Sequence, residues 1–101
     1  MNLEEVSGRW EIDLPAMLDL AAAPDLQGTI LEALARKSDR GVLLKAQMVE
    51  RMSTACVQVI LAAAKATPDG VRRRVVVEAP SEVFSSAFAQ LGLADDLANM
   101  I

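Results

Sequence analysis

The chain has 101 residues, 52% of them hydrophobic and 24% charged, with a formal net charge of −4. This length predicts a single domain spanning residues 1–101, since so short a chain can bury one hydrophobic core but not two. The acidic net charge argues against a nucleic-acid binder. The apolar stretches are too short for membrane insertion. Because the chain has no histidine and no tyrosine, a Ser-His-Asp relay and a His-ligated metal site are excluded.

The first predicted element is a strand over residues 9–14. Three apolar residues alternate there with three charged ones, which is the period of a strand buried on one face. The inward residues are Trp10, Ile12 and Leu14, and the residues expected to face water are Arg9, Glu11 and Asp13. Residues 15–20 then continue extended or form a second short strand.

A helix is predicted to begin at Pro24, because proline is well tolerated in the first turn of a helix. Leu26, Ile30 and Leu34 recur at intervals of four residues and form its buried side. Its solvent-facing residues are Gln27, Glu32, Arg36 and Lys37. We expect an ordinary packing helix that ends before the break at residues 38–41.

The middle of the chain predicts a central strand followed by a buried helix. Residues 42–44 are a short apolar run of the kind found in a strand covered on both faces. A loop over residues 47–51 leads to a second helix over about residues 53–66, where only Gln58 and Lys65 are clearly polar after the first turn. We expect this helix to be heavily buried.

The last third predicts one more strand and two helices. Turn residues at 67–70 precede a β-branched strand over residues 75–77. Ser81 is expected to cap a third helix that ends at Gly92, followed by a short tail helix. The core positions of the third helix are Phe84, Ala87, Phe88 and Leu91. Strands that alternate with helices in this way predict an α/β layer structure with parallel neighbouring strands.

No motif for catalysis stands out. The five glycines are scattered, so the chain has no glycine-rich phosphate loop. The carboxylates that could act in catalysis are explained equally well as solvated side chains: Glu4, Glu5, Glu11, Asp13 and Asp19. We therefore expect no enzymatic activity, no cofactor and no metal. A lone cysteine, and an acidic start unlike a signal peptide, indicate a cytoplasmic protein.

Two features leave alternatives open. Cys56 lies near a predicted helix start, which lowers the pKa of a thiol and would suit a redox role, but free cysteines are more often packed as small apolar residues. Residues 72–74 are three consecutive arginines. They could bind an anion, or they could be a solvated strand edge protected against aggregation. We favour the structural explanation in both cases.

Four short segments stand in a recognisable order and spacing: Leu14–Asp19, Val49–Leu61, Pro80–Ser81 and Leu91–Leu93. They resemble the motifs of the STAS domains, a family named for sulfate transporters and anti-sigma factor antagonists. The resemblance covers most of the chain and implies an α/β fold with a four- to five-stranded mixed sheet flanked by three to four helices. The chain is also similar, more weakly, to the small STAS proteins of bacterial chemotaxis clusters.

In phosphorylated STAS domains, an aspartate, two serines and a glycine open the second helix, and the second serine accepts the phosphate. The corresponding residues here are Ser53, Thr54, Ala55 and Cys56. Ala55 has no hydroxyl, so the resemblance leaves Thr54, or Ser53, as the substitute acceptor. The simpler alternative is that Thr54 only caps the helix. Lys45 stands where the family often has an aspartate.

The resemblance implies a non-catalytic protein-interaction module of bacterial signalling. It would act in transcription regulation as an anti-sigma factor antagonist does, by docking on an anti-sigma factor with a histidine-kinase-like fold or on a chemotaxis kinase component. The implied docking face consists of Asp19, Glu50, Arg51, Met52, Ser53, Thr54 and Ala55. The alternative is a cytoplasmic STAS subunit of a membrane lipid transporter, docked on its ATPase. A small-molecule binder has no supporting motif, and a homodimer stays open.

Overall fold

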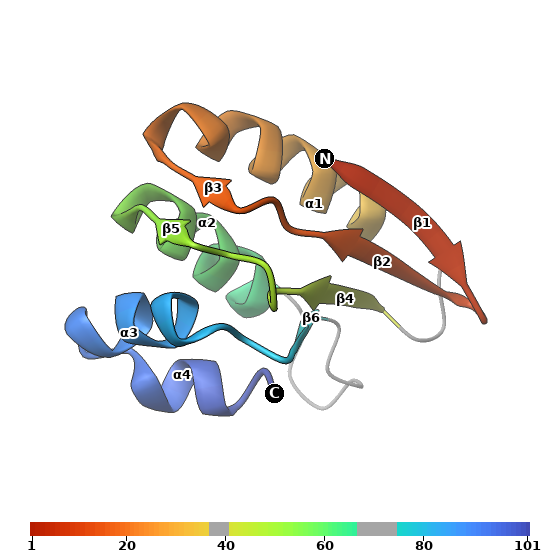
Figure 1. Ribbon diagram of the computed structural model, residues 1–101. Helices are drawn as coiled ribbons and strands as arrows, with labels where there is room; N and C mark the ends of the chain where they lie inside the picture. Colours follow the sequence, from red (N-terminus) through yellow and green to blue (C-terminus); the bar gives the residue numbers. More distant parts are fainter. Residues whose placement is uncertain (37–40, 67–74) are drawn as a thin grey trace.

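A computed structural model describes residues 1–36, 41–66 and 75–101 of the chain (Figure 1). Its main sheet has the strand order β1-β2-β4-β6, formed by β1 (Asn2–Val6), β2 (Arg9–Asp13), β4 (Val42–Lys45) and β6 (Val75–Glu78). A separate two-stranded sheet pairs β3 (Met17–Leu18) with β5 (Arg51–Met52). The helices are α1 (Ala23–Ala35), α2 (Thr54–Lys65), α3 (Glu82–Gln90) and α4 (Ala94–Ala98), and a 3₁₀ turn, η1 (Leu20–Ala22), precedes α1.

The main sheet is mixed, as the STAS resemblance implies. β2, β4 and β6 run parallel, with Trp10 opposite Val42 and Val42 opposite Val75. β1 pairs antiparallel with β2 through a two-residue turn in which Ser7 and Gly8 have φ values of 50° and 84°. Two positive φ values match the twist of a tight hairpin, and glycine adopts the second without strain. β1 is not predicted from the sequence, because its acidic pair at residues 4 and 5 interrupts any apolar alternation.

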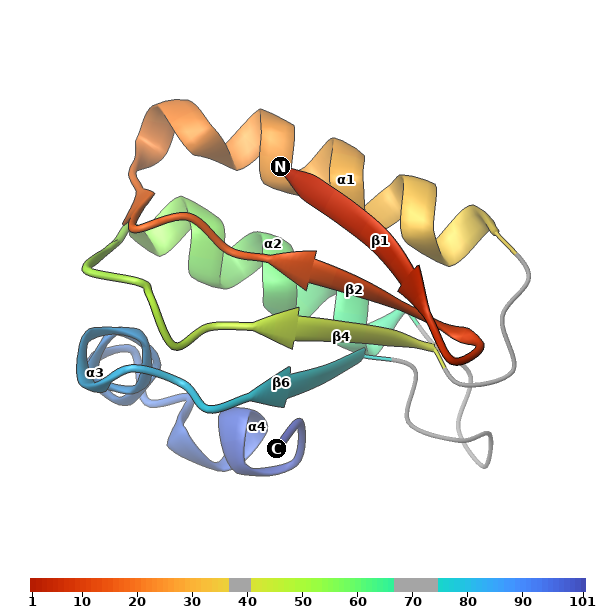
Figure 2. The same cartoon turned by 45° about the vertical axis from the view of Figure 1, so that its right-hand side comes forward.

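The helices cover one face of the sheet and its β6 side (Figure 2). α1 and α2 lie against one face, while α3 and α4 lie beside β6, where the Val77 N–H donates to the Met100 carbonyl at 2.7 Å. The core between these layers includes these fully or almost fully buried side chains: Ile12, Leu18, Leu26, Ile30, Leu44, Val57, Ile60, Val77, Phe84 and Phe88. The predicted four-stranded, helix-flanked architecture is confirmed, and β4 is an interior strand whose Val42–Leu44 run is buried throughout.

Three burial predictions are wrong. α2 fully buries only Cys56, Val57, Ile60 and Ala63, because its other apolar residues are half-buried at the margins of the packed side or, in the case of Ala62, exposed. Leu91 is 42% exposed, since the chain leaves α3 there and turns through Gly92 at a φ of 73°. Glu11 is buried, although its strand position suggested solvent, because two cations pair with it.

Ser81 caps α3, as predicted. Its hydroxyl oxygen accepts from the Phe84 N–H at 3.1 Å and its O–H donates to the Val49 carbonyl at 2.6 Å, so the same side chain ties the start of α3 to the loop before β5. α1 begins one residue before Pro24. The predicted turn at residues 67–70, the Arg72–Arg74 run and Lys37 lie outside the described residues.

Candidate functional site

The start of α2 is the feature that the sequence singles out. The chain leaves β5, takes an extended conformation at Ser53, and enters the helix at Thr54. The Ser53 hydroxyl accepts a hydrogen bond from the Cys56 N–H at 3.2 Å, which satisfies one of the unpaired amides at a helix start. Thr54 is exposed and is the first helical residue. The expectation that Thr54 caps the helix is therefore wrong, because the cap is Ser53.

Asp19 lies next to the start of α2, although the two are far apart in the sequence. The Ser53 N–H donates to the Leu18 carbonyl at 2.7 Å, and the Cys56 thiol donates to the Asp19 carbonyl at 3.4 Å. The Asp19 carboxylate accepts from the Ala22 N–H at 3.0 Å and caps η1. Asp19 is half-buried, so its outer side remains open to solvent.

The short β3–β5 sheet holds the remaining predicted residues at the same end of the molecule. Met17 lies opposite Arg51 and Leu18 opposite Met52, and both the Glu50 and Arg51 N–H groups donate to the Ala16 carbonyl. Glu50 and Arg51 are exposed, whereas Met52 and Ala55 are half-buried and pack against the core. All seven residues of the predicted docking face are thus brought to one region.

Cys56 is fully buried within the core cluster. Its thiol donates to the Asp19 carbonyl and is not exposed to solvent. The expectation of a packed rather than a solvent-accessible cysteine is confirmed.

Three exposed apolar residues at this end were not predicted from the sequence, namely Met17, Leu20 and Met48. Nor was a shallow groove between β5 and α3 predicted, which is lined by Met52, Glu82, Val83, Ser86, Ala87 and Gln90. The sequence contains only a weak indication that these residues are exposed. Met17 stands directly before buried Leu18 in an extended segment, so strand alternation points it outward.

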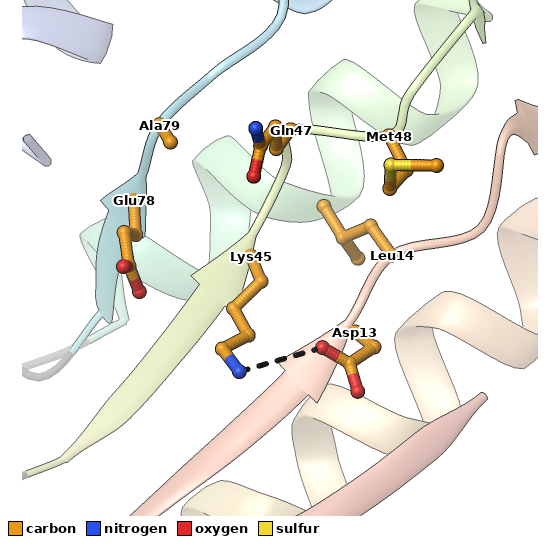
Figure 3. A pocket seen from close by; sticks show the side chains of 7 residues that line it. All are labelled: Asp13, Leu14, Lys45, Gln47, Met48, Glu78 and Ala79. Atoms are coloured by element: carbon orange, nitrogen blue, oxygen red, sulfur yellow. Dashed lines mark ion pairs between the residues drawn. The ribbon is translucent and has the colours of Figure 1, made fainter.

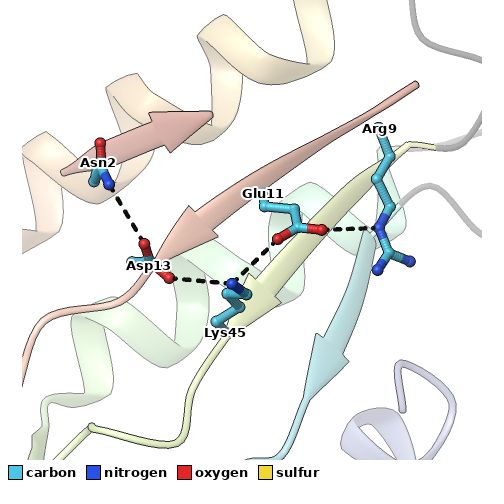
Figure 4. Close-up of polar contacts among 5 residues, drawn as sticks. All are labelled: Asn2, Arg9, Glu11, Asp13 and Lys45. Carbon is cyan, nitrogen blue, oxygen red and sulfur yellow. Dashed lines mark hydrogen bonds and ion pairs between the residues drawn. The ribbon is translucent and has the colours of Figure 1, made fainter. Parts of the chain in front are cut away.

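An ion-pair network crosses the sheet face that faces away from α1 and α2 (Figure 4). Lys45 Nζ lies 3.2 Å from Glu11 Oε1 and 3.8 Å from Asp13 Oδ1, and Arg9 Nε lies 3.3 Å from Glu11 Oε2. Asn2 Nδ2 donates to Asp13 at 3.4 Å. Lys45, the departure from the family pattern, therefore neutralises carboxylates of β2.

A pocket open to solvent lies at the carboxyl ends of β2, β4 and β6, beside this network (Figure 3). Its lining residues are Asp13, Leu14, Lys45, Gln47, Met48, Glu78 and Ala79. The charges across it alternate in sign, from Asp13 through Lys45 to Glu78. Such a row suits polar contacts with a partner surface rather than the tight enclosure of a small ligand.

The network shifts two pKa values. Burial raises the pKa of Glu11, but hydrogen bonds from Lys45 and Arg9 and the charges of both outweigh it, so the pKa of Glu11 lies below its ordinary 4.5. The hydrogen bond to Glu11, aided by nearby carboxylates, raises the pKa of Lys45 above its ordinary 10.5. Both shifts favour the charged forms in the folded state.

Acid should reduce the contribution of this network to the stability of the fold. Because folding lowers the pKa of Glu11, its contribution to stability is present above pH 4.5 and is lost as the pH falls through its folded value. We expect Glu11→Gln to lower the free energy of unfolding near neutral pH and to flatten the acid limb of a stability–pH curve. Urea unfolding followed by circular dichroism over a pH series measures both effects, and an unchanged acid limb would contradict the assignment.

The cap assignment predicts different stabilities for neighbouring hydroxyl variants. Ser53→Ala should cost about 0.5–2 kcal/mol of unfolding free energy, because the Cys56 amide loses its acceptor. Thr54→Ala should change it by less than about 0.5 kcal/mol, since Thr54 is exposed and does not cap α2. Urea unfolding of both variants tests the prediction. A larger loss in Thr54→Ala than in Ser53→Ala would reverse the assignment.

In the part of the chain that the structure describes, no group of three or more Cys, Asp or Glu side chains is arranged to hold a metal ion. The helices of that part also lack the combination of length and hydropathy that a membrane span requires.

Comparison with known proteins supports the family assignment. The chain has no significant match among curated proteins. A family model described as "Mlab, STAS domain" matches residues 1–101, the whole chain. The mixed sheet and the flanking helices agree with that match. The chain therefore belongs to the STAS domain family, whose members are generally non-catalytic regulatory or interaction modules.

Proposed function

We propose that this domain is a docking module of bacterial signalling that binds a regulatory protein through the face around the start of α2. Its partner is an anti-sigma factor or another regulator with a histidine-kinase-like fold, and the domain acts by occupying that partner. The main supporting observation is the convergence of Asp19, the Glu50–Met52 strand and the Ser53–Ala55 helix start at one end of the fold.

Thr54 is the better candidate for regulation by phosphate. Its side chain is exposed at the first position of α2, whereas the Ser53 hydroxyl is engaged with the Cys56 amide. A phosphate on Thr54 would sit at the partly positive helix start, so the fold would tolerate it. Its charge of about −1.5 to −2 would have to be desolvated within the docking face, and this cost would oppose partner binding.

A second function is favoured by Ala55, which occupies the phosphoacceptor position and has no hydroxyl. A domain without the usual acceptor suits permanent docking rather than a switch. We therefore keep the alternative of a STAS subunit that stabilises the cytoplasmic ATPase of a membrane lipid transporter. In this case the ATPase would bind the same face, and phosphorylation would not release it.

The experiment is affinity purification of the tagged full chain from its native cells, identification of retained proteins, and measurement of binding with each purified candidate. A kinase-like regulator that binds the purified chain would support the signalling proposal, and a transport ATPase would favour the alternative. If the partner that binds is neither, or if binding is unaffected by substitutions at Asp19 and Thr54, the proposal is wrong.

A further inference from the structure

Three apolar side chains are exposed at the end of the molecule that carries the proposed docking face. Met17, Leu20 and Met48 are 53%, 72% and 69% exposed, and we refer to them together as the apolar patch. Their chain neighbours Leu18 and Val49 are almost completely buried, so these segments hold one side chain in the core and present the next to solvent. An exposed apolar patch of this kind typically marks a protein contact.

The three residues come from adjoining segments. The Ala16 carbonyl accepts from the Glu50 N–H at 2.7 Å and from the Arg51 N–H at 2.9 Å, which holds the chain before Met17 against the chain after Met48. Leu20 opens η1 directly after Asp19, whose carbonyl accepts from the Cys56 thiol, so this segment lies against the start of α2. The start of α2 and the apolar patch are therefore at the same end of the fold. Methionine suits such a position because its unbranched side chain adapts to a partner's shape.

Carboxylates outnumber cations around the apolar patch. Among the described residues, this end of the molecule carries the acidic residues Asp19, Glu50, Glu78 and Glu82 and the basic residue Arg51, besides two ion pairs, Asp13 with Lys45 and Asp25 with the Met1 ammonium. Lys45 is already paired with Glu11 and Asp13, so it offers little charge to a partner. A partner whose charges complement this rim would be basic, and such complementarity favours association and rejects acidic surfaces.

We propose that the apolar patch is the centre of the docking face and that the partner presents apolar side chains flanked by lysine or arginine. This inference rests on the proposed function and specifies the chemistry of the partner. Apolar contacts with Met17, Leu20 and Met48 supply most of the affinity, since a few central residues usually dominate an interface. The acidic rim selects a basic surface.

A labelled synthetic amphipathic helix of leucine and lysine serves as the probe, and its binding to the full chain is measured by fluorescence anisotropy. A helix of leucine and glutamate with the same pattern is the charge control. The lysine peptide should bind, the glutamate peptide should not, and added salt should weaken binding by screening the rim. Leu20→Asp should weaken binding at least about tenfold. The new carboxylate by itself would attract the lysines of the peptide. A loss of affinity in Leu20→Asp would therefore report the loss of the apolar contact.

Leu31→Asp is the matched control, because Leu31 is 58% exposed on α1, away from the apolar patch. Its affinity for the peptide should equal that of wild type. Leu20→Ser provides a second, uncharged variant with the same expected loss. Equal effects of Leu20→Asp and Leu31→Asp, equal binding of both peptides, or no binding of the lysine peptide would each overturn the inference.

A concentration-dependent dimer in sedimentation, abolished by Leu20→Asp, would also overturn it, in favour of a second copy as the occupant. Failure here is distinguishable from failure of the proposed function. If the peptide results fail while Thr54→Glu still weakens binding of the native partner, only the assignment of the apolar patch is wrong.

Discussion

Phe84→Ala is expected to lower the free energy of unfolding by about 3–5 kcal/mol, because it removes a large, fully buried side chain and leaves a cavity. Phe84 lies in α3 and packs on Phe88 with ring centroids 5.3 Å apart and ring planes tilted by 32°. Such an aromatic pair adds about 0.5–1.5 kcal/mol beyond burial. Urea unfolding followed by circular dichroism measures the loss, which is a large part of the stability of about 5–15 kcal/mol typical of a small domain.

Val83→Ala is the control for this prediction. Val83 is the preceding residue of the same helix but is 42% exposed, so the substitution should cost about 1 kcal/mol or less. Phe84→Leu should fall between the two, since leucine refills part of the cavity. A loss below about 1 kcal/mol in Phe84→Ala would contradict the packing of α3 on the core.

Thr54→Glu is expected to weaken partner binding by about 1 kcal/mol or more, because docking would bury the new carboxylate at the start of α2 within the apolar part of the contact, away from the basic side chains that face the acidic rim. The same substitution should leave the fold intact, since an acidic side chain at a helix start is favourable. Binding and folding should therefore change independently. Calorimetry against the purified partner measures the affinity, and circular dichroism checks the fold.

Thr54→Gln is the matched control for size, because it adds the same length without the charge. Glu32→Gln is the control for position, since Glu32 is exposed on α1. Both should bind nearly as wild type does. If Thr54→Glu bound with unchanged affinity, the partner would dock elsewhere.

Most of the fold could be predicted from local periodicity. The alternation around Ile12, the apolar run of Val42–Leu44 and the turn at Gly92 each specify an element without knowledge of the rest of the chain. β1 could not be predicted in this way, because an edge strand is exposed on much of its surface and needs no apolar alternation. Its place depends on the hairpin at Ser7–Gly8 and on pairing with β2.

The candidate site could be predicted only in outline. The motif order located the α2 start and Asp19, but it did not show which hydroxyl caps the helix, because Ser53 and Thr54 are adjacent and chemically alike. The pairing of Lys45 with Glu11 depends on the register of β2 against β4, which no local pattern specifies. The apolar patch was missed for a similar reason. Exposed methionines and leucines look like core residues until the strands and turns are placed.

Amide hydrogen exchange of the full chain, free and bound to the identified partner, tests the central claim most directly. We expect protection on binding over residues 16–20 and 48–56, the segments that carry the apolar patch and the α2 start. We expect no change on the exposed side of α1 around Leu31. Protection confined to α1 or α4, with residues 48–56 exchanging as in the free chain, would show that the partner docks on a different face.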